Sequence, residues 1–182
     1  MPKFQDAATW QQAEQLMQPI FIRLIDNLRK QLDETPTWRG TYEDVPLWPE
    51  GVSEEVKAQV LELRSRLGNV PPEEIAAIES ALADLPAPHP GYWLCLTRQD
   101  QQSKIDPIKI DLWELCYQIC FRDYDVATGT SRSRGFGQPQ SQGVEVDRSL
   151  FDEFGDVDWN RLDDKTQRLV GQIFAGLPVG LL

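Results

Sequence analysis

The chain has 182 residues and a mass of 20.8 kDa, which suits one ordinary domain, or a domain with a helical appendage, and excludes two large domains. Its 18 lysines and arginines face 29 aspartates and glutamates, and the formal net charge of -11 disfavours binding to nucleic acid or to an anionic membrane. An apolar share of 41% and a charged share of 26% exclude a wholly disordered or collagen-like chain. We therefore expect a soluble, acidic, folded protein.

The N-terminal stretch has the periodicity of an amphipathic helix. From residue 6 to residue 32, apolar side chains recur at spacings of three, four or seven, as one helical face requires; they are Trp10, Met17, Ile20, Leu24, Leu28 and Leu32. Pro19 lies inside this stretch and removes one backbone donor, so we expect a kink or a break near residues 15–18. The helix is predicted to end by Glu34, because Pro36 disfavours the α conformation of the residue before it.

Residues 35–52 contain three prolines, two glycines and three aromatic rings, a mixture that favours an ordered but irregular loop. Ser53 is placed to cap a helix over residues 54–67, which Gly68 ends. A second short helix is predicted from Pro72, a residue favoured at the first helical position. The predicted core side chains of this helical hairpin are Val56, Val60, Leu63, Leu67, Ile75, Ile78 and Leu82.

We predict a single domain over residues 1–182. A proline-rich segment, residues 86–91, cannot continue a helix and divides this domain into a helical part, 1–85, and an α+β part, 91–182. The compact apolar run at residues 92–97 predicts a buried strand, and the imperfect alternation over residues 104–112 predicts a second one. Together they suggest an antiparallel pair.

Residues 111–122 carry two conflicting patterns. Asp111 with Glu114 fits a helical capping box, and the spacing of several apolar residues fits one helical face. The alternation of large side chains fits a strand equally well; they are Trp113, Leu115, Tyr117, Ile119 and Phe121. The aromatic content and the predicted strands nearby favour a strand here.

The rest of the chain is predicted as a loop followed by helices. Residues 128–143 hold four glycines and one large apolar side chain, which indicates a mobile loop. A short acidic helix is expected over residues 150–154 and a final helix over 163–175, whose inward side chains are Leu162, Leu169, Ile173 and Phe174. The favoured fold is α+β, with an N-terminal helical layer, a small antiparallel sheet and a C-terminal helix; an all-α fold is the alternative.

Three cysteines, Cys95, Cys116 and Cys120, cannot all pair within one chain, so we expect reduced thiols. Cys116 and Cys120 lie among large apolar residues, an environment that raises the thiol pKa and favours a structural role. The sequence shows no signal peptide and no apolar run long enough to span a membrane, so a cytoplasmic location is predicted.

No motif in the sequence specifies a reaction. The single histidine, His89, lies in a rigid Pro-His-Pro turn, which favours an exposed side chain over a catalytic one. The cysteine and histidine spacings match no zinc site, and the acidic C-terminal region lacks an EF-hand loop, so no metal or other cofactor is expected. These observations favour a non-enzymatic protein.

Four residues are the candidate binding groups. Asp123 and Asp125 follow an apolar run and precede the glycine-rich loop, which is a suitable place for a functional carboxylate. Arg132 and Arg134 form a basic cluster within that loop and offer donors to an anion or to an acidic partner. The last fourteen residues, 169–182, carry no charge and either cover the domain's own core or contact another protein.

The chain is rich in glutamine, in tryptophan and in Asp-containing turns, and in this it resembles small, soluble, uncharacterised proteins of cyanobacteria. This resemblance implies no particular activity. The first hypothesis is therefore an accessory or regulatory protein that binds another protein. The second is a small enzyme or ligand-binding protein that acts on an anionic or metal-bound substrate through the four candidate residues.

Overall fold

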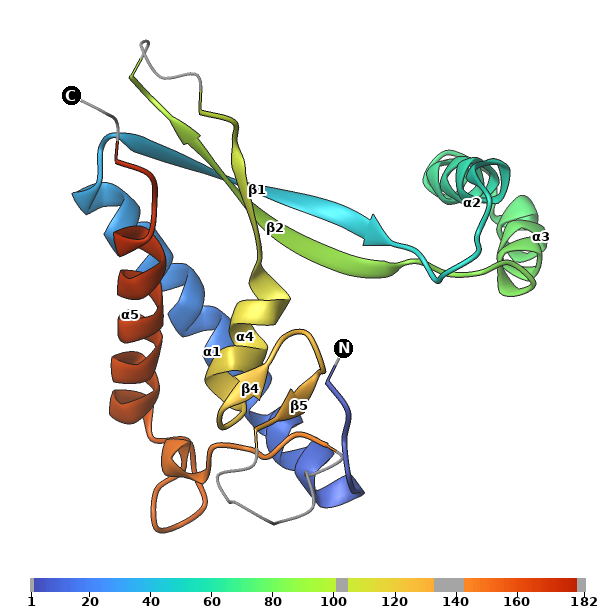
Figure 1. The fold of residues 1–182 in the computed structure, drawn as a ribbon. Helices are drawn as coiled ribbons and strands as arrows, with labels where there is room; N and C mark the ends of the chain where they lie inside the picture. Colours follow the sequence, from blue (N-terminus) through green and yellow to red (C-terminus); the bar gives the residue numbers. More distant parts are fainter. Residues whose placement is uncertain (1, 101–104, 133–142, 180–182) are drawn as a thin grey trace. The chain divides into compact units, whose positions relative to one another are not determined.

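A computed structural model describes residues 2–100, 105–132 and 143–179 (Figure 1). Within these residues helices combine with a three-stranded sheet and a two-stranded one, which confirms the predicted α+β class. The chain divides into two compact units: the first comprises Met1–Tyr42 and Leu94–Leu182, and the second comprises Glu43–Trp93.

Helix α1, Ala7–Glu34, confirms the predicted N-terminal helix. The Asp6 carboxylate begins it by accepting a hydrogen bond from the Thr9 amide at 2.7 Å. A kink or a break is expected near residues 15–18, and the helix continues through Pro19, so the break is wrong: one lost backbone donor is outweighed by a buried apolar face. Trp10, which the periodicity predicts on that face, is 48% exposed, so this prediction is wrong; the buried apolar residues of the face are Ala13, Leu16, Ile20, Leu24 and Leu28.

The three-stranded sheet has the order β1-β2-β3, formed by Trp38–Leu47, His89–Arg98 and Ile108–Asp111. Strand β2 confirms the predicted strand at residues 92–97, and β3 is shorter than the strand predicted over 104–112. The loop predicted over residues 35–52 is wrong, because β1 lies within it. Pairing with β2 offsets the low strand propensity of its glycine and proline.

Gly40 explains how β1 meets the end of α1. A Cβ atom at this position would lie 2.7 Å from Leu32 Cδ1 and 3.0 Å from Leu94 Cδ1. The missing side chain therefore lets the helix and the strand approach each other closely.

The second unit contains the predicted helical hairpin, α2 (Glu54–Leu67) and α3 (Pro72–Ala83). The Ser53 hydroxyl accepts the Val56 amide at 3.3 Å, and Pro72 occupies the first turn of α3, as predicted. Of the seven predicted core side chains only Val60 and Ile78 are buried. The core of this hairpin is therefore thin.

Residues Leu112–Cys120 form helix α4, so the preference for a strand was wrong. One oxygen of Asp111 accepts the amides of Trp113 at 2.9 Å and Glu114 at 3.4 Å. This cap satisfies backbone amides of the first turn. The helix is further stabilised by buried side chains at helical spacing, which are Leu112, Leu115, Cys116, Ile119 and Cys120. The helix packs against α1 in the first unit.

Two short strands follow α4: β4, Tyr124–Asp125, pairs antiparallel with β5, Thr130–Ser131. The start of the predicted mobile loop is thus part of a hairpin, and residues 133–142 lie outside the described residues. A 3₁₀ turn, η1, covers Arg148–Leu150, and a hydrogen-bonded loop replaces the acidic helix predicted over 150–154. Asp152 there hydrogen-bonds to two later amides, which favours a turn over a helix.

Helix α5, Trp159–Ala175, confirms the predicted final helix and begins four residues earlier, where the Asp158 carboxylate caps it. Its buried side chains are Leu162, Thr166 and Val170. Leu169, Ile173 and Phe174, which the periodicity also predicts to face inward, are partly exposed. The helix packs mainly against α1.

All three cysteines are buried and free, in agreement with the prediction of reduced structural thiols. None of the helices in the described part of the chain is long and apolar enough to cross a membrane.

Candidate functional site

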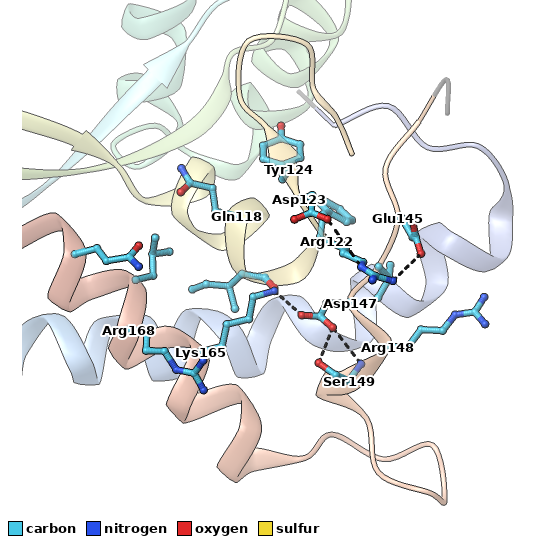
Figure 2. Close-up of a pocket in the computed structure, with 15 residues that line it drawn as sticks. Gln118, Arg122, Asp123, Tyr124, Glu145, Asp147, Arg148, Ser149, Lys165 and Arg168 are labelled. Atoms are coloured by element: carbon cyan, nitrogen blue, oxygen red, sulfur yellow. Dashed lines mark hydrogen bonds and ion pairs between the residues drawn. The ribbon is translucent and has the colours of Figure 1, made fainter. Parts of the chain in front are cut away.

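The first unit carries an open groove of about 720 Å³. It is formed by the C-terminal half of α4, the start of β4, residues 145–149 and one side of α5 (Figure 2). Most of its lining is polar; the apolar members are Ile119, Phe121, Val146 and Leu169. We call this set of residues the groove.

The charged residues of the groove include four cations, Arg122, Arg148, Lys165 and Arg168. They outnumber its three carboxylates, which are Asp123, Glu145 and Asp147. This balance is the reverse of the whole chain, in which acidic residues predominate by 29 to 18. The groove is therefore a locally cationic place on a strongly acidic protein.

Lys165 and Asp147 form the shortest ion pair among the described residues of the groove. Lys165 Nζ donates to Asp147 Oδ2 at 2.6 Å and to the Ile119 carbonyl at 2.6 Å, which ties α5 to the end of α4. Burial alone would raise the pKa of Asp147, but hydrogen bonds from Lys165 and from the Ser149 hydroxyl outweigh it and hold this pKa below its ordinary value. Both charges of this pair are satisfied within the protein.

Arg122 pairs only loosely. Its guanidinium lies 3.8 Å from a Glu145 oxygen and 4.0 Å from an Asp123 oxygen, at the outer limit of an ion pair. The Arg122 side chain is 52% exposed, so these contacts hold it weakly. Its charge remains accessible to a ligand in the groove.

Arg148 and Arg168 are the two groove cations that form no ion pair with a carboxylate of the described residues. Arg148 lies on η1. Arg168 lies one turn after Lys165 on α5, and Figure 2 shows the side chains of Lys165 and Arg168 next to each other. A guanidinium offers several donors in a planar arrangement that matches a carboxylate or a phosphate. The groove can therefore bind an anionic group.

Tyr124 lines the groove and belongs to an aromatic cluster. The ring of Tyr124 lies 5.7 Å from that of Phe121 and 5.9 Å from that of Tyr117, measured between centroids. Burial, together with the carboxylate of Glu114 and the ring of Tyr117, raises the pKa of Tyr124 to about 12. The hydroxyl thus stays protonated at neutral pH, and it has no hydrogen-bond partner among the described atoms.

The structure places the four predicted site residues differently. Asp123 lines the groove and adopts a left-handed backbone conformation with φ of 46°, which a short polar residue tolerates. Asp125 accepts the Ala127 amide at 2.9 Å and pairs with Arg132 at 3.2 Å across the β4–β5 hairpin. The Ala127 amide and then Arg132 lower the pKa of Asp125, so this pair stabilises the turn. Arg134 lies outside the described residues.

None of the four groove cations, Arg122, Arg148, Lys165 and Arg168, was among the residues predicted from the sequence. Arg122 lies between α4 and β4 and Arg148 lies on η1, and only the three-residue spacing of Lys165 and Arg168 on a predicted helix indicates a shared face. His89, at the start of β2, is exposed. Among the described residues no group of three or more histidines, cysteines or carboxylates is placed to hold a metal ion.

Comparisons of the chain with protein-family models, with curated proteins and with solved structures gave no match.

Proposed function

We propose that the chain is a non-enzymatic accessory protein that binds another protein through the groove, by holding an acidic segment of that partner. One observation carries the proposal: four cations gather in a groove of a chain whose formal net charge is -11. Clustering like charges is unfavourable unless an opposite charge is supplied, and two of these arginines receive none from the described carboxylates.

The shape and lining of the groove favour a peptide segment over a small molecule. Small-molecule pockets are lined mostly by apolar side chains around a few polar groups, whereas this groove has the opposite composition. Its cations also come from separate elements, so they suit several carboxylates spaced along a chain. A cytosolic location accompanies this proposal, because all three thiols are free.

Binding of a fluorescent hexaglutamate peptide, measured by anisotropy, tests the proposal. Reversing the charge of Arg148 and Arg168 together, R148E/R168E, is expected to weaken binding at least about tenfold, which corresponds to about 1.4 kcal/mol. Binding to the unchanged protein is expected to weaken as the salt concentration rises.

Arg64→Glu is the matched control, because Arg64 is an exposed arginine on α2 of the second unit. Arg64→Glu reverses one positive charge, as each substitution of the double variant does, and it should leave the affinity for the peptide unchanged. Circular dichroism of each variant should match that of the parent. Equal affinity of the double variant and the parent would refute the groove as the binding site.

A further inference from the structure

A second feature of the first unit complements the groove: a short loop at residues 151–157, which follows η1. Phe151 and Val157 close the loop through an antiparallel bridge, and the Asp152 amide donates to the Asp156 carbonyl at 2.8 Å. One Asp152 oxygen accepts the amides of Phe154 at 2.8 Å and Asp156 at 3.0 Å. The loop therefore has one well-determined conformation.

Gly155 completes this turn with φ of 84°, in the left-handed region that favours glycine. Its carbonyl accepts a long, exposed hydrogen bond from the Gln15 side chain of α1 at 3.4 Å, a contact between the loop and the body of the unit. The hydrogen bonds within the loop and the left-handed Gly155 thus define the backbone of the tip without a partner.

The tip of this rigid loop presents Phe154 to solvent, with 82% of the residue exposed. Asp152, Glu153 and Asp156 surround it with carboxylates. A large aromatic side chain on a pre-ordered backbone loses little conformational entropy on binding, and such residues dominate the energy of protein interfaces. The loop is therefore an acidic segment with an aromatic anchor.

The groove has the complementary composition. Besides its four cations, the groove has two half-exposed side chains with apolar surface, Tyr124 and Leu169, while Ile119 and Phe121 beneath them are buried. An aromatic ring flanked by carboxylates suits such a site, because the ring can cover Tyr124 and Leu169 while the carboxylates reach the guanidinium groups. The occupant that the chain itself supplies is this loop.

We infer that the 151–157 loop of a second copy of the chain docks in the groove, so that the protein associates with itself. The inference rests on the proposed function, since it identifies the acidic segment that the groove takes. The loop does not fill the groove of its own chain, because its Phe154 is exposed. Since loop and groove belong to one unit, two copies that exchange loops reciprocally would form a closed dimer.

The net charge of -11 on each copy opposes this association at long range. At physiological ionic strength the screening length is about 8 Å, so remote charges contribute little while pairs in direct contact persist. Association is therefore expected at moderate salt rather than at very low salt.

Sedimentation velocity from about 1 to 200 µM tests the inference at physiological salt. The unchanged protein is expected to show a concentration-dependent dimer. Phe154→Ala and Arg168→Glu are each expected to raise the dimer dissociation constant at least about tenfold. The control is Leu61→Ala, which shortens an exposed apolar side chain outside the loop, on α2, and should leave the dimer dissociation constant unchanged.

Mixing the two variants separates docking from an indirect effect. In a mixed dimer the intact loop of the Arg168→Glu chain meets the intact groove of the Phe154→Ala chain, and neither variant alone offers both. The mixture should therefore form more dimer than either variant alone. Hexaglutamate should dissociate the dimer by competing for the groove.

A protein that stays monomeric over the whole range, or a dimer that neither variant weakens, would overturn the inference. Hexaglutamate binding that R148E/R168E abolishes would in that case still support the proposed function. A dimer sensitive to both variants, together with no binding of hexaglutamate, would keep the loop as the ligand and refute capture of general acidic segments.

Discussion

Cys116 and Cys120 lie on the buried face of α4, both fully inaccessible to solvent. Burial raises the pKa of each thiol to about 12; the Cys120 side chain adds to the effect on Cys116, while Lys165 opposes it at Cys120. A thiol with such a pKa is almost wholly protonated at pH 8 and reacts slowly with alkylating agents.

Intact-mass measurement after brief treatment with iodoacetamide should therefore show both thiols unmodified in the native protein and fully modified in denaturant. Modification of the native protein at the rate of the denatured chain would contradict the buried assignment.

The Asp147–Lys165 pair predicts a pH dependence of stability. The folded-state pKa of Asp147 is lowered, so its contribution to the free energy of unfolding is present above the unfolded pKa of about 3.9 and is lost as the pH falls through the folded value. At pH 7, Asp147→Asn should lower that free energy by about 1.5 to 3 kcal/mol, the usual range for a hydrogen bond to a charged group.

Urea unfolding at pH 7 and pH 3 measures this effect, and the difference between the variant and the parent should shrink at the lower pH. Asp164→Asn, at an exposed position of α5, is the control and should change stability by less than about 0.5 kcal/mol. A difference that is the same at both pH values would refute the role of the Asp147 charge.

At the scale of elements, α1 owes its place to one apolar face. Leu24 is fully buried in that face, whereas Ile22 on the same helix is 50% exposed. Leu24→Ala should lower the free energy of unfolding by about 2 to 5 kcal/mol, because it removes buried methyl groups and leaves a cavity.

Ile22→Ala, at the exposed position, should change stability by less than about 0.5 kcal/mol. Chemical denaturation monitored by tryptophan fluorescence compares the two variants. An unchanged midpoint for Leu24→Ala would mean that α1 contributes little to the core.

The elements also show where sequence patterns suffice. Helices α1, α2, α3 and α5 follow from apolar periodicity and from caps such as Ser53, since these signals are local. In the α4 segment the two periodicities conflict, and the Asp111 cap decides between them. Strand β1 depends on pairing with β2 from about fifty residues away, a non-local effect that no local pattern contains.

At the scale of the molecule, the two units differ in how much they bury. Helices α2 and α3 of the second unit bury only Val60 and Ile78 between them, while α1 of the first unit buries six residues. Amides whose opening exposes little apolar surface exchange faster. Hydrogen-exchange mass spectrometry should therefore show faster exchange over residues 54–83 than over residues 16–28, and equal protection of the two segments would contradict the prediction.

The groove could not be predicted from the sequence, because it forms only when the whole first unit has folded. Its cations lie at positions 122, 148, 165 and 168, and only tertiary packing gathers them. Asp123 was found because a carboxylate directly after an apolar run is visible locally. Arg148 stands in an acidic stretch, where nothing in the sequence distinguishes it from a solvated surface residue.

The packing of α1 against α5 also sets the order of events during synthesis. About 125 residues separate the end of α1 from the start of α5, and at about 5 to 20 residues per second the ribosome needs about 6 to 25 s to translate them. When α5 begins to be made, the second unit, Glu43–Trp93, is already complete, whereas the apolar face of α1 has not yet met its main neighbour. Until then only α4 is available to pack against α1, so the face that contains Leu16, Ile20, Leu24 and Leu28 is fully covered only after the last helix is made.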